Sequence, residues 1–190
     1  IGYLLGAHEF SWSRALLVML GGLLVTGSAN IINQVYEREL DKLMTRTAQR
    51  PLPLGIISPV EAWVFCVLLG MAGLGLLAMQ FNYLTAALSL LSLILYGFIY
   101  TPLKTISPIC VAVGAIPGGL PPLIGWVAAT GYIGVEAWVL FGIQFMWQFP
   151  HFWAIAWVAD DDYKRAGFKM LPSPGKRDLR TAFQIMTYTL

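Results

Sequence analysis

Long apolar runs alternate with short polar segments along most of the chain. Five runs are long enough to cross a membrane as helices, because a bilayer core about 30 Å thick needs roughly 20 apolar residues. The runs are continuously apolar rather than alternating, which favours helices over the strands of a membrane barrel. The predicted spans cover residues 14–36, 58–80, 83–101, 107–129 and 134–158, with a partial helix before residue 8 and another helix beginning at about residue 179.

The composition also indicates a membrane protein. Of the 190 residues, 57% are apolar and 12% are charged, which is about half the charge of a soluble domain. We therefore expect one all-α domain over residues 1–190, a polytopic transmembrane helical bundle that is truncated at both ends. No signal peptide is recognisable at the start. The net charge of +2 argues against a nucleic-acid partner.

The two cysteines, Cys66 and Cys110, lie inside apolar runs without a CxxC or metal-ligand spacing. We expect them to be buried thiols rather than a disulfide or a zinc site.

The basic residues predict how the chain is oriented. If the five spans alternate, eleven of the twelve Lys and Arg residues fall on one side, in segments 37–57, 101–106 and 159–180, and Arg14 alone falls on the other. Lys and Arg are retained on the cytoplasmic side of membranes. The pattern predicts a multi-pass protein of a bacterial inner (plasma) membrane, with its charged segments and its active site facing the cytoplasm.

A polar stripe marks the end of the first complete span. Asn33, Glu37 and Asp41 recur every four residues and would share one face of a helix. Such groups are costly at membrane depth unless they face a cavity or a partner. A solvated helix end would explain the acids alone, but Asn33 lies a turn deeper among apolar residues. Mg²⁺ prefers oxygen ligands of this kind together with substrate phosphates.

A second acidic group, Asp160, Asp161 and Asp162, is expected on the same membrane face. Two acidic groups surrounded by Lys and Arg predict a site for a metal-bound diphosphate. Arg46 and Arg50 are spaced one helical turn apart before a helix stop at Pro51, and their forked donors suit phosphate oxygens. The surrounding basic residues are Arg38, Lys42, Arg46, Arg50, Lys104, Lys164, Arg165 and Lys169, whereas Lys176, Arg177 and Arg180 are interpreted as lipid-facing topology signals.

A shift of 119 residues aligns part of the first polar segment with the second. It superposes Asp41, Arg46, Arg50, Leu52 and Pro53 on Asp160, Arg165, Lys169, Leu171 and Pro172. Transporters and related membrane proteins built from repeats often place a site between the halves. An internal duplication with two facing half-sites is therefore a hypothesis, and a chance match is its alternative.

Several motifs in unbroken order resemble one family. The segments are NQVYERELDKLMTRTAQRPLP, YTPLK, GGLPPLIGW, PHFWAIAW and DDDYKRAGFKMLP. Together they are similar to the protohaem IX farnesyltransferases (haem O synthases), a branch of the UbiA-type intramembrane prenyltransferases. The resemblance implies a bundle of nine helices, of which about six to seven would be present. It also implies an Mg²⁺-dependent enzyme that transfers farnesyl from farnesyl diphosphate to a vinyl group of haem B, giving haem O.

The resemblance also assigns roles to residues. Asn33, Glu37 and Asp41 match the first acidic motif, and the three consecutive aspartates match the second, so all six are expected metal ligands. Of these, Asn33, Glu37, Asp41, Asp161 and Asp162 are the expected catalytic residues. The second motif departs from the family pattern, because Trp157 and Val158 stand where a preceding aspartate is usual. The expected diphosphate-binding residues are Arg46, Arg50, Lys104 and Lys164.

The acceptor side of the site follows from the resemblance and from the aromatic residues. His151, Tyr100 and Trp153 are the expected acceptor-binding residues, with His151 as a ligand of the haem iron or a partner of a propionate. Aromatic rings would shield a farnesyl cation, and the candidates are Tyr36, Tyr96, Tyr100, Phe149, Phe152 and Trp153. Three prolines within Gly114–Trp126 favour a broken helix beside the acceptor. His8 is expected on the surface.

The expected partners are the lipid bilayer, farnesyl diphosphate, haem B and a haem A synthase. Two alternatives stay open. One is a related prenyltransferase that acts on an aromatic quinone precursor or on chlorophyllide. The other is a membrane transporter, which the nearly uncharged opposite side argues against.

Overall fold

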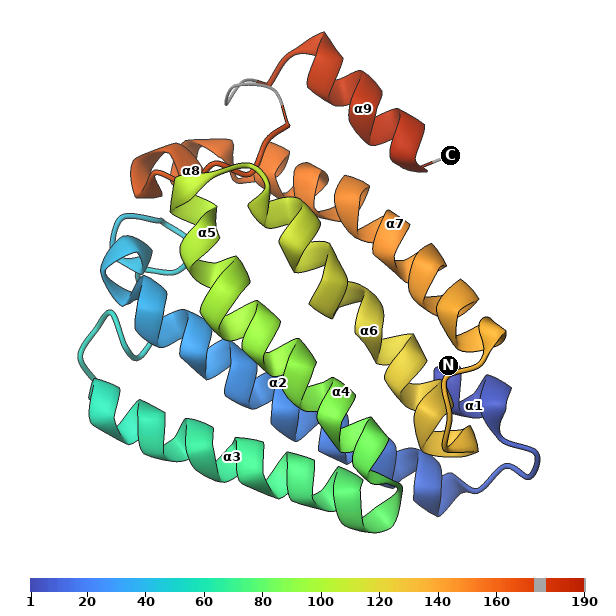
Figure 1. Cartoon of the computed structure of the whole chain (residues 1–190). Coiled ribbons are helices and arrows are strands. Elements are labelled where there is room, and N and C mark those ends of the chain that lie inside the picture. Colours follow the sequence, from blue (N-terminus) through green and yellow to red (C-terminus); the bar gives the residue numbers. More distant parts are fainter. Residues whose placement is uncertain (173–176, 190) are drawn as a thin grey trace.

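The computed structural model describes residues 1–172 and 177–189, and the regular structure in this part of the chain is entirely helical. The elements follow the predicted runs closely (Figure 1). They are α1 (Gly2–Gly6), α2 (Trp12–Asp41), α3 (Pro59–Gln80), α4 (Tyr83–Ile94), the π-helical η1 (Leu95–Tyr100), α5 (Thr101–Ile106), α6 (Cys110–Thr130), α7 (Val135–Val158), α8 (Asp160–Ala166) and α9 (Leu179–Thr189).

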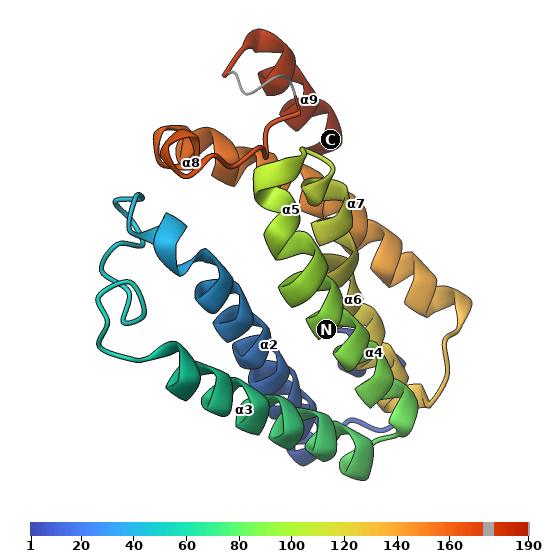
Figure 2. The same ribbon diagram turned by 60° about the vertical axis from the view of Figure 1, so that its left-hand side comes forward.

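The long helices lie side by side and alternate in direction (Figure 1). Helix α2 packs on α3, α6 packs on α7, and α4 contacts both α3 and α6. Residues 42–58, α5 and α8 gather at one end of the bundle, as Figure 2 also shows. We call this end the charged end. The short connections at residues 81–82 and 131–134 lie at the opposite end.

Four helices have the length and composition of membrane spans: Trp12–Asp41, Pro59–Gln80, Tyr83–Ile106 and Cys110–Thr130. Their outward side chains, such as Met19, Leu23 and Met71, are more than half exposed, as lipid-facing residues are. The protein is an integral membrane protein. Helix α7 has 24 residues, but Gln144, Gln148 and His151 make it more polar, so its crossing stays a prediction.

Glycines let the helices that carry the site approach one another closely. A Cβ atom on Gly97 would come within 2.9 Å of the Ile32 side chain, and one on Gly114 would come within 2.6 Å of the Tyr100 ring. Missing Cβ atoms therefore let η1 lie directly against α2 and against α6. The Tyr100 ring thus packs on α6, and the backbone of η1 at Gly97 packs on α2.

The prediction of a broken helix at Gly114–Trp126 was wrong, because α6 is continuous through Pro117, Pro121 and Pro122. Pro121 and Pro122 lack the N–H groups that would bind the carbonyls of Pro117 and Gly118. Neighbouring helices supply donors instead. Ser92 Oγ donates to Pro117 O over 3.4 Å, and Gln148 Nε2 donates to Gly118 O over 3.1 Å.

The segment that follows α2 also differs from expectation. The helix ends at Asp41 rather than at Pro51, and residues 42–55 form successive turns. The Thr47 hydroxyl donates to the carbonyl of Asp41 over 3.1 Å, so a side chain binds a carbonyl at the end of the helix. Arg46 and Arg50 therefore lie on a folded loop and not on successive turns of a helix.

Two smaller predictions are confirmed. Cys66 and Cys110 are free and buried, and Ser28 Oγ donates to the Cys66 carbonyl over 2.9 Å where α2 meets α3. His8 lies exposed in the segment between α1 and α2.

Candidate active site

A polar cavity of about 340 Å³ lies at the charged end of the bundle. The polar stripe of α2 forms one wall, the loop after α2 and η1–α5 form two others, and α7 and the α8 region close it. The lining residues, which define the polar cavity, are Asn30, Asn33, Gln34, Glu37, Asp41, Met44, Arg46, Thr47, Arg50, Tyr96, Tyr100, Lys104, Phe152, Ile155, Tyr163, Phe168 and Met170.

Glu37 and Lys104 form a buried ion pair in this cavity. Lys104 Nζ lies 2.8 Å from Glu37 Oε1, and the two side chains are only 10% and 7% exposed. The same ammonium lies 4.7 Å from the centroid of the Tyr100 ring and 5.6 Å from that of Phe168. Aromatic faces attract a cation, so the lysine is held between the carboxylate and two rings.

Asp41 and Arg50 form a second pair beside the first. Arg50 Nη1 lies 2.9 Å from Asp41 Oδ2, and the Asp41 side chain is fully buried. The other carboxylate oxygen, Asp41 Oδ1, has no hydrogen-bond partner, and Glu37 Oε1 has no hydrogen bond besides its ion pair with Lys104. Buried polar atoms are nearly always bonded, so Asp41 Oδ1 indicates a ligand of positive charge or with donor groups.

Asn33 lies deeper along the same face of α2. Its Nδ2 donates to Thr101 Oγ1 over 3.2 Å, and that hydroxyl donates to the carbonyl of Tyr96 over 2.9 Å. Tyr96 and Tyr100 of the π-helical η1 line the cavity together with Lys104 of α5. A π-helical turn inside a helix is frequent at functional sites.

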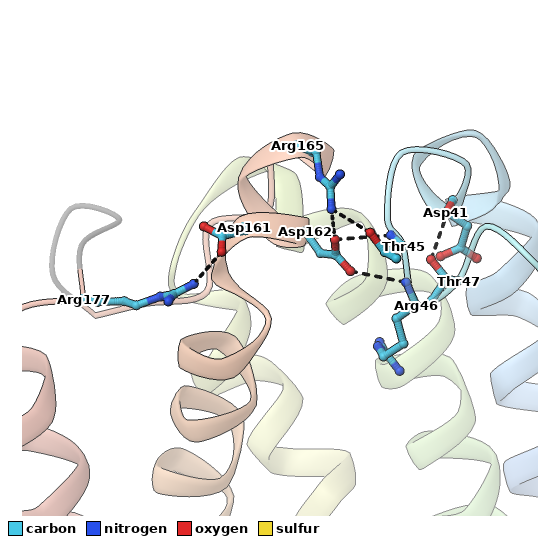
Figure 3. A network of polar contacts seen from close by, with 8 residues as sticks. All are labelled: Asp41, Thr45, Arg46, Thr47, Asp161, Asp162, Arg165 and Arg177. Atoms are coloured by element: carbon cyan, nitrogen blue, oxygen red, sulfur yellow. Dashed lines mark hydrogen bonds and ion pairs between the residues drawn. The ribbon is translucent and has the colours of Figure 1, made fainter.

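The second acidic group lies outside the polar cavity. Asp160 pairs with Lys164 over 2.7 Å and with Arg177 over 3.0 Å, and Asp161 is 87% exposed. Asp162 accepts hydrogen bonds from the main-chain N–H groups of the loop after α2 (Figure 3). The structure therefore does not bring these three carboxylates to Glu37 and Asp41.

The predicted diphosphate-binding residues fall into two groups, inside and outside the polar cavity. Arg46, Arg50 and Lys104 line the polar cavity, but Lys164 is 58% exposed and bound to Asp160. The sequence duplication has no counterpart in local structure, because Arg46 lies in a turn and Arg165 in helix α8.

An apolar chamber of about 300 Å³ adjoins the polar cavity and shares Asn30, Tyr96 and Phe152 with it. It is lined by Val25, Thr26, Ala29, Asn30, Ser92, Leu93, Tyr96, Gly114, Pro117, Gly118, Pro121, Gln148 and Phe152. The proline-rich part of α6 thus borders this chamber. A polar cavity next to an apolar chamber suits an amphipathic molecule with an anionic head.

Of the predicted acceptor residues, only Tyr100 lines the polar cavity. His151 stacks on Trp147 with ring centroids 4.6 Å apart, and Trp153 is packed between Phe149 and Tyr188. Among the remaining cation-shielding candidates, Tyr96 and Phe152 line both spaces, whereas Tyr36 is half exposed beside Phe98.

Sequence reasoning missed several residues of the cavity. Asn30 is exposed to both spaces although it lies within a predicted span, and its position three residues before Asn33 was the available signal. Tyr163 and Phe168 complete the wall from the α8 region. Neither aromatic residue carried a local signal that distinguished it from ordinary packing.

The site can hold a divalent cation only together with other ligands. In residues 1–172 and 177–189, no three Asp, Glu, His or Cys side chains gather closely enough to form a metal centre. Asp41 and Glu37 nevertheless offer hard, buried oxygens with unused bonding capacity. Mg²⁺ is commonly held by one or two carboxylates, water and substrate phosphate, and this donor set fits that pattern.

The fold and the site define a polytopic membrane protein with paired acids and bases in a cavity at one end of its bundle. The chain belongs to the UbiA prenyltransferase family, whose model matches residues 1–190.

Curated relatives are similar to the chain over its whole length. The protoheme IX farnesyltransferase of Cytophaga hutchinsonii is 55% identical over 191 residues, which cover 100% of this chain and 67% of the relative. That of Flavobacterium psychrophilum is 50% identical over 192 residues, covering 100% of this chain and 63% of the relative. The chain thus spans about two thirds of the length of these relatives.

Solved structures share the fold. A UbiA homologue from Aeropyrum pernix K1 superposes with a TM-score of 0.78 at 22% identity, covering 98% of this chain and 71% of that chain. A UbiA homologue from Archaeoglobus fulgidus bound to DMAPP and Mg²⁺ gives a TM-score of 0.74 at 21% identity, covering 99% and 67%.

Proposed function

We propose that the protein transfers a farnesyl group from farnesyl diphosphate to a vinyl group of haem B, giving haem O. The observation that carries the proposal is the polar cavity, where two buried acid–base pairs lie next to an apolar, aromatic chamber. The names of the curated relatives support haem B as acceptor. We also propose that the protein lies in a bacterial inner membrane and that its site faces the cytoplasm. A haem A synthase would receive the product.

The cavity residues divide the work of binding. Arg46, Arg50 and Lys104 would bind the diphosphate oxygens, because guanidinium and ammonium groups pair strongly with phosphate. Asn33, Glu37 and Asp41 would hold Mg²⁺. When bound, the metal neutralises the charge that develops on the leaving diphosphate.

The aromatic residues would protect the reactive carbon. Tyr96, Tyr100 and Phe152 lie between the charged groups and the chamber. Their faces would stabilise an allylic cation and exclude water while the C–O bond breaks. The vinyl group of haem B would attack this carbon, and addition of water to the resulting cation, with release of one proton to solvent, would complete the hydroxyethylfarnesyl group.

The proposal is tested with purified protein, farnesyl diphosphate, Mg²⁺ and haem B, with haem O detected by mass spectrometry. Glu37→Ala and Asp41→Ala are each expected to lower turnover by about a hundredfold or more, the scale typical for loss of a group that stabilises developing charge. Glu39→Ala is the matched control, because its exposed carboxylate lies on the same helix and pairs with Arg38 and Lys42.

Two results would contradict the proposal. Prenylation of 4-hydroxybenzoate without any haem O would assign the protein a different acceptor. Near-normal turnover in both alanine variants, with the proteins inserted and folded, would show that Glu37 and Asp41 are not needed for the reaction.

A further inference from the structure

Asp162 joins two parts of the chain that are far apart in sequence. Its Oδ1 accepts a hydrogen bond from Thr45 N over 3.2 Å, and its Oδ2 accepts one from Arg46 N over 3.3 Å. Arg165, one turn further along α8, pairs with Asp162 Oδ1 and also donates to Thr45 Oγ1 over 2.9 Å. Figure 3 shows this group of contacts between α8 and the loop after α2. We call Thr45, Arg46, Asp162 and Arg165 the loop clasp.

The loop clasp lies next to the polar cavity and connects two of its walls. Arg46 and Thr47 line the cavity from the loop, and Tyr163 lines it from α8. A second connection fixes the segment after α8, because Lys169 N donates to the carbonyl of Lys104 over 2.7 Å. The α8 region is thus attached to α5 on one side and to the loop on the other.

Arg46 contacts Asp162 through its main chain, and its side chain lies at the cavity, where it interacts with Tyr163. The N–H group of Arg46 points to Asp162, while its side chain extends away from that carboxylate (Figure 3) and lines the cavity. The position of the guanidinium group therefore depends on where the loop backbone is fixed.

Asp162 has the bonding pattern of an anchor rather than that of a metal ligand. Both of its oxygens already accept hydrogen bonds from the loop, and Arg165 lies against it. Burial alone would raise the pKa of Asp162, but the two N–H donors and Arg165 outweigh it and hold the pKa below the usual range.

We propose that Asp162, together with Arg165, is a positioning residue that fixes the loop after α2 so that the Arg46 guanidinium faces the diphosphate. This role rests on the proposed function for its ligand, and it departs from the metal role that the sequence motif predicts for Asp162. In this proposal Asn33, Glu37 and Asp41 of α2 bind the metal. The loop clasp places the Arg46 guanidinium on the opposite side of the diphosphate.

The first experiment measures binding of inorganic diphosphate in the presence of Mg²⁺ to the wild type, Asp162→Asn, Arg165→Gln and the double variant. Each single change is expected to weaken binding about tenfold, the scale of a lost hydrogen bond to a charged group. The double variant is expected to be no weaker than either single variant, because both residues act through one contact. The Mg²⁺ concentration at half-maximal binding should stay at the wild-type value in all three.

Glu39→Gln is the control for loss of one negative charge at the charged end, since Glu39 is exposed and contacts neither the loop clasp nor the polar cavity. A metal ligand would behave differently. If Asp162→Asn raised the Mg²⁺ requirement tenfold while Arg165→Gln bound diphosphate like the wild type, Asp162 would be a metal ligand and the proposal would be overturned.

The second experiment does not depend on any ligand. Trypsin can cleave the loop after Lys42 and after Arg46, and the loop clasp should slow this by holding the backbone. Asp162→Asn and Arg165→Gln are both expected to speed cleavage at these sites at least several-fold, whereas Asp161→Asn should not, because Asp161 pairs only with Arg177 among the described contacts.

The two experiments separate the inference from the proposed function. If the wild type bound no diphosphate, the proposed function would be contradicted. The trypsin experiment would still test the loop clasp. Unchanged cleavage in both Asp162→Asn and Arg165→Gln would refute the clasp even in a fully active enzyme.

Discussion

At the scale of single residues, both carboxylates that line the polar cavity, Glu37 and Asp41, are paired with a cation, yet Asp41 keeps one oxygen without a partner. Lys104 lies 2.8 Å from Glu37, and Arg50 lies 2.9 Å from Asp41. Buried pairs of this kind contribute little net stability, but removing one partner leaves an uncompensated charge. The presence of these ion pairs is thus better explained by ligand binding than by a contribution to folding stability.

Lys104→Met is predicted to destabilise the folded protein by about 3 kcal/mol, because it leaves the Glu37 carboxylate buried without its cation. Adding Glu37→Gln to that variant should restore most of the lost stability, since no buried charge remains. Transfer activity should stay lost in both. Thermal unfolding in detergent and haem O formation are the two measurements, and an active double variant would argue against a binding role for the pair.

The residues of the site differ in how far the sequence could reveal them. Asn33, Glu37 and Asp41 follow a spacing of four, and the geometry of a helix is enough to place them on one face. The partners of Asp162 lie 116 and 117 residues away in the chain, and no local pattern predicts such contacts. Because these contacts were not predictable, the sequence motif alone placed the second acidic group at the metal. In the structure its side chains lie outside the polar cavity.

At the scale of elements, hydropathy placed the helices well because it depends only on neighbouring residues. The predicted runs 58–80 and 134–158 differ by only a residue from α3 and α7. Proline was less informative, because a helix tolerates it where another element binds the freed carbonyl. The donors that do so here, Ser92 and Gln148, come from α4 and α7, so the continuity of α6 could not be predicted from α6 alone.

Gln148→Leu is predicted to destabilise the bundle by about 1–3 kcal/mol, because the buried carbonyl of Gly118 loses its donor. Pro122→Ala should offset that loss, since it restores the N–H group that bonds four residues back in a helix. Thermal unfolding of the two single variants and the double variant measures the effect. Additive destabilisation in the double variant would show that the carbonyl is not the shared cause.

At the scale of the whole molecule, charge is concentrated where the chain leaves the apolar bundle. The ion pairs among the described residues all involve the last turns of α2, the loop after it, α5, α8 or Arg177. One charged end suits an enzyme that takes a charged substrate from one side of the membrane. A transporter would need polar groups accessible from both sides.

The orientation of the bundle gives the last prediction, which needs no substrate. Cys66 and Cys110 are 3% and 0% exposed, so they should not react with a membrane-impermeant maleimide. Gln49→Cys would add an exposed thiol at the charged end, and Tyr132→Cys would add one at the opposite end, where Tyr132 is 58% exposed. Because eleven of the twelve basic residues favour the cytoplasmic side, intact spheroplasts should label only Tyr132→Cys. Inside-out vesicles should label only Gln49→Cys, and the reverse pattern would place the polar cavity on the outer face.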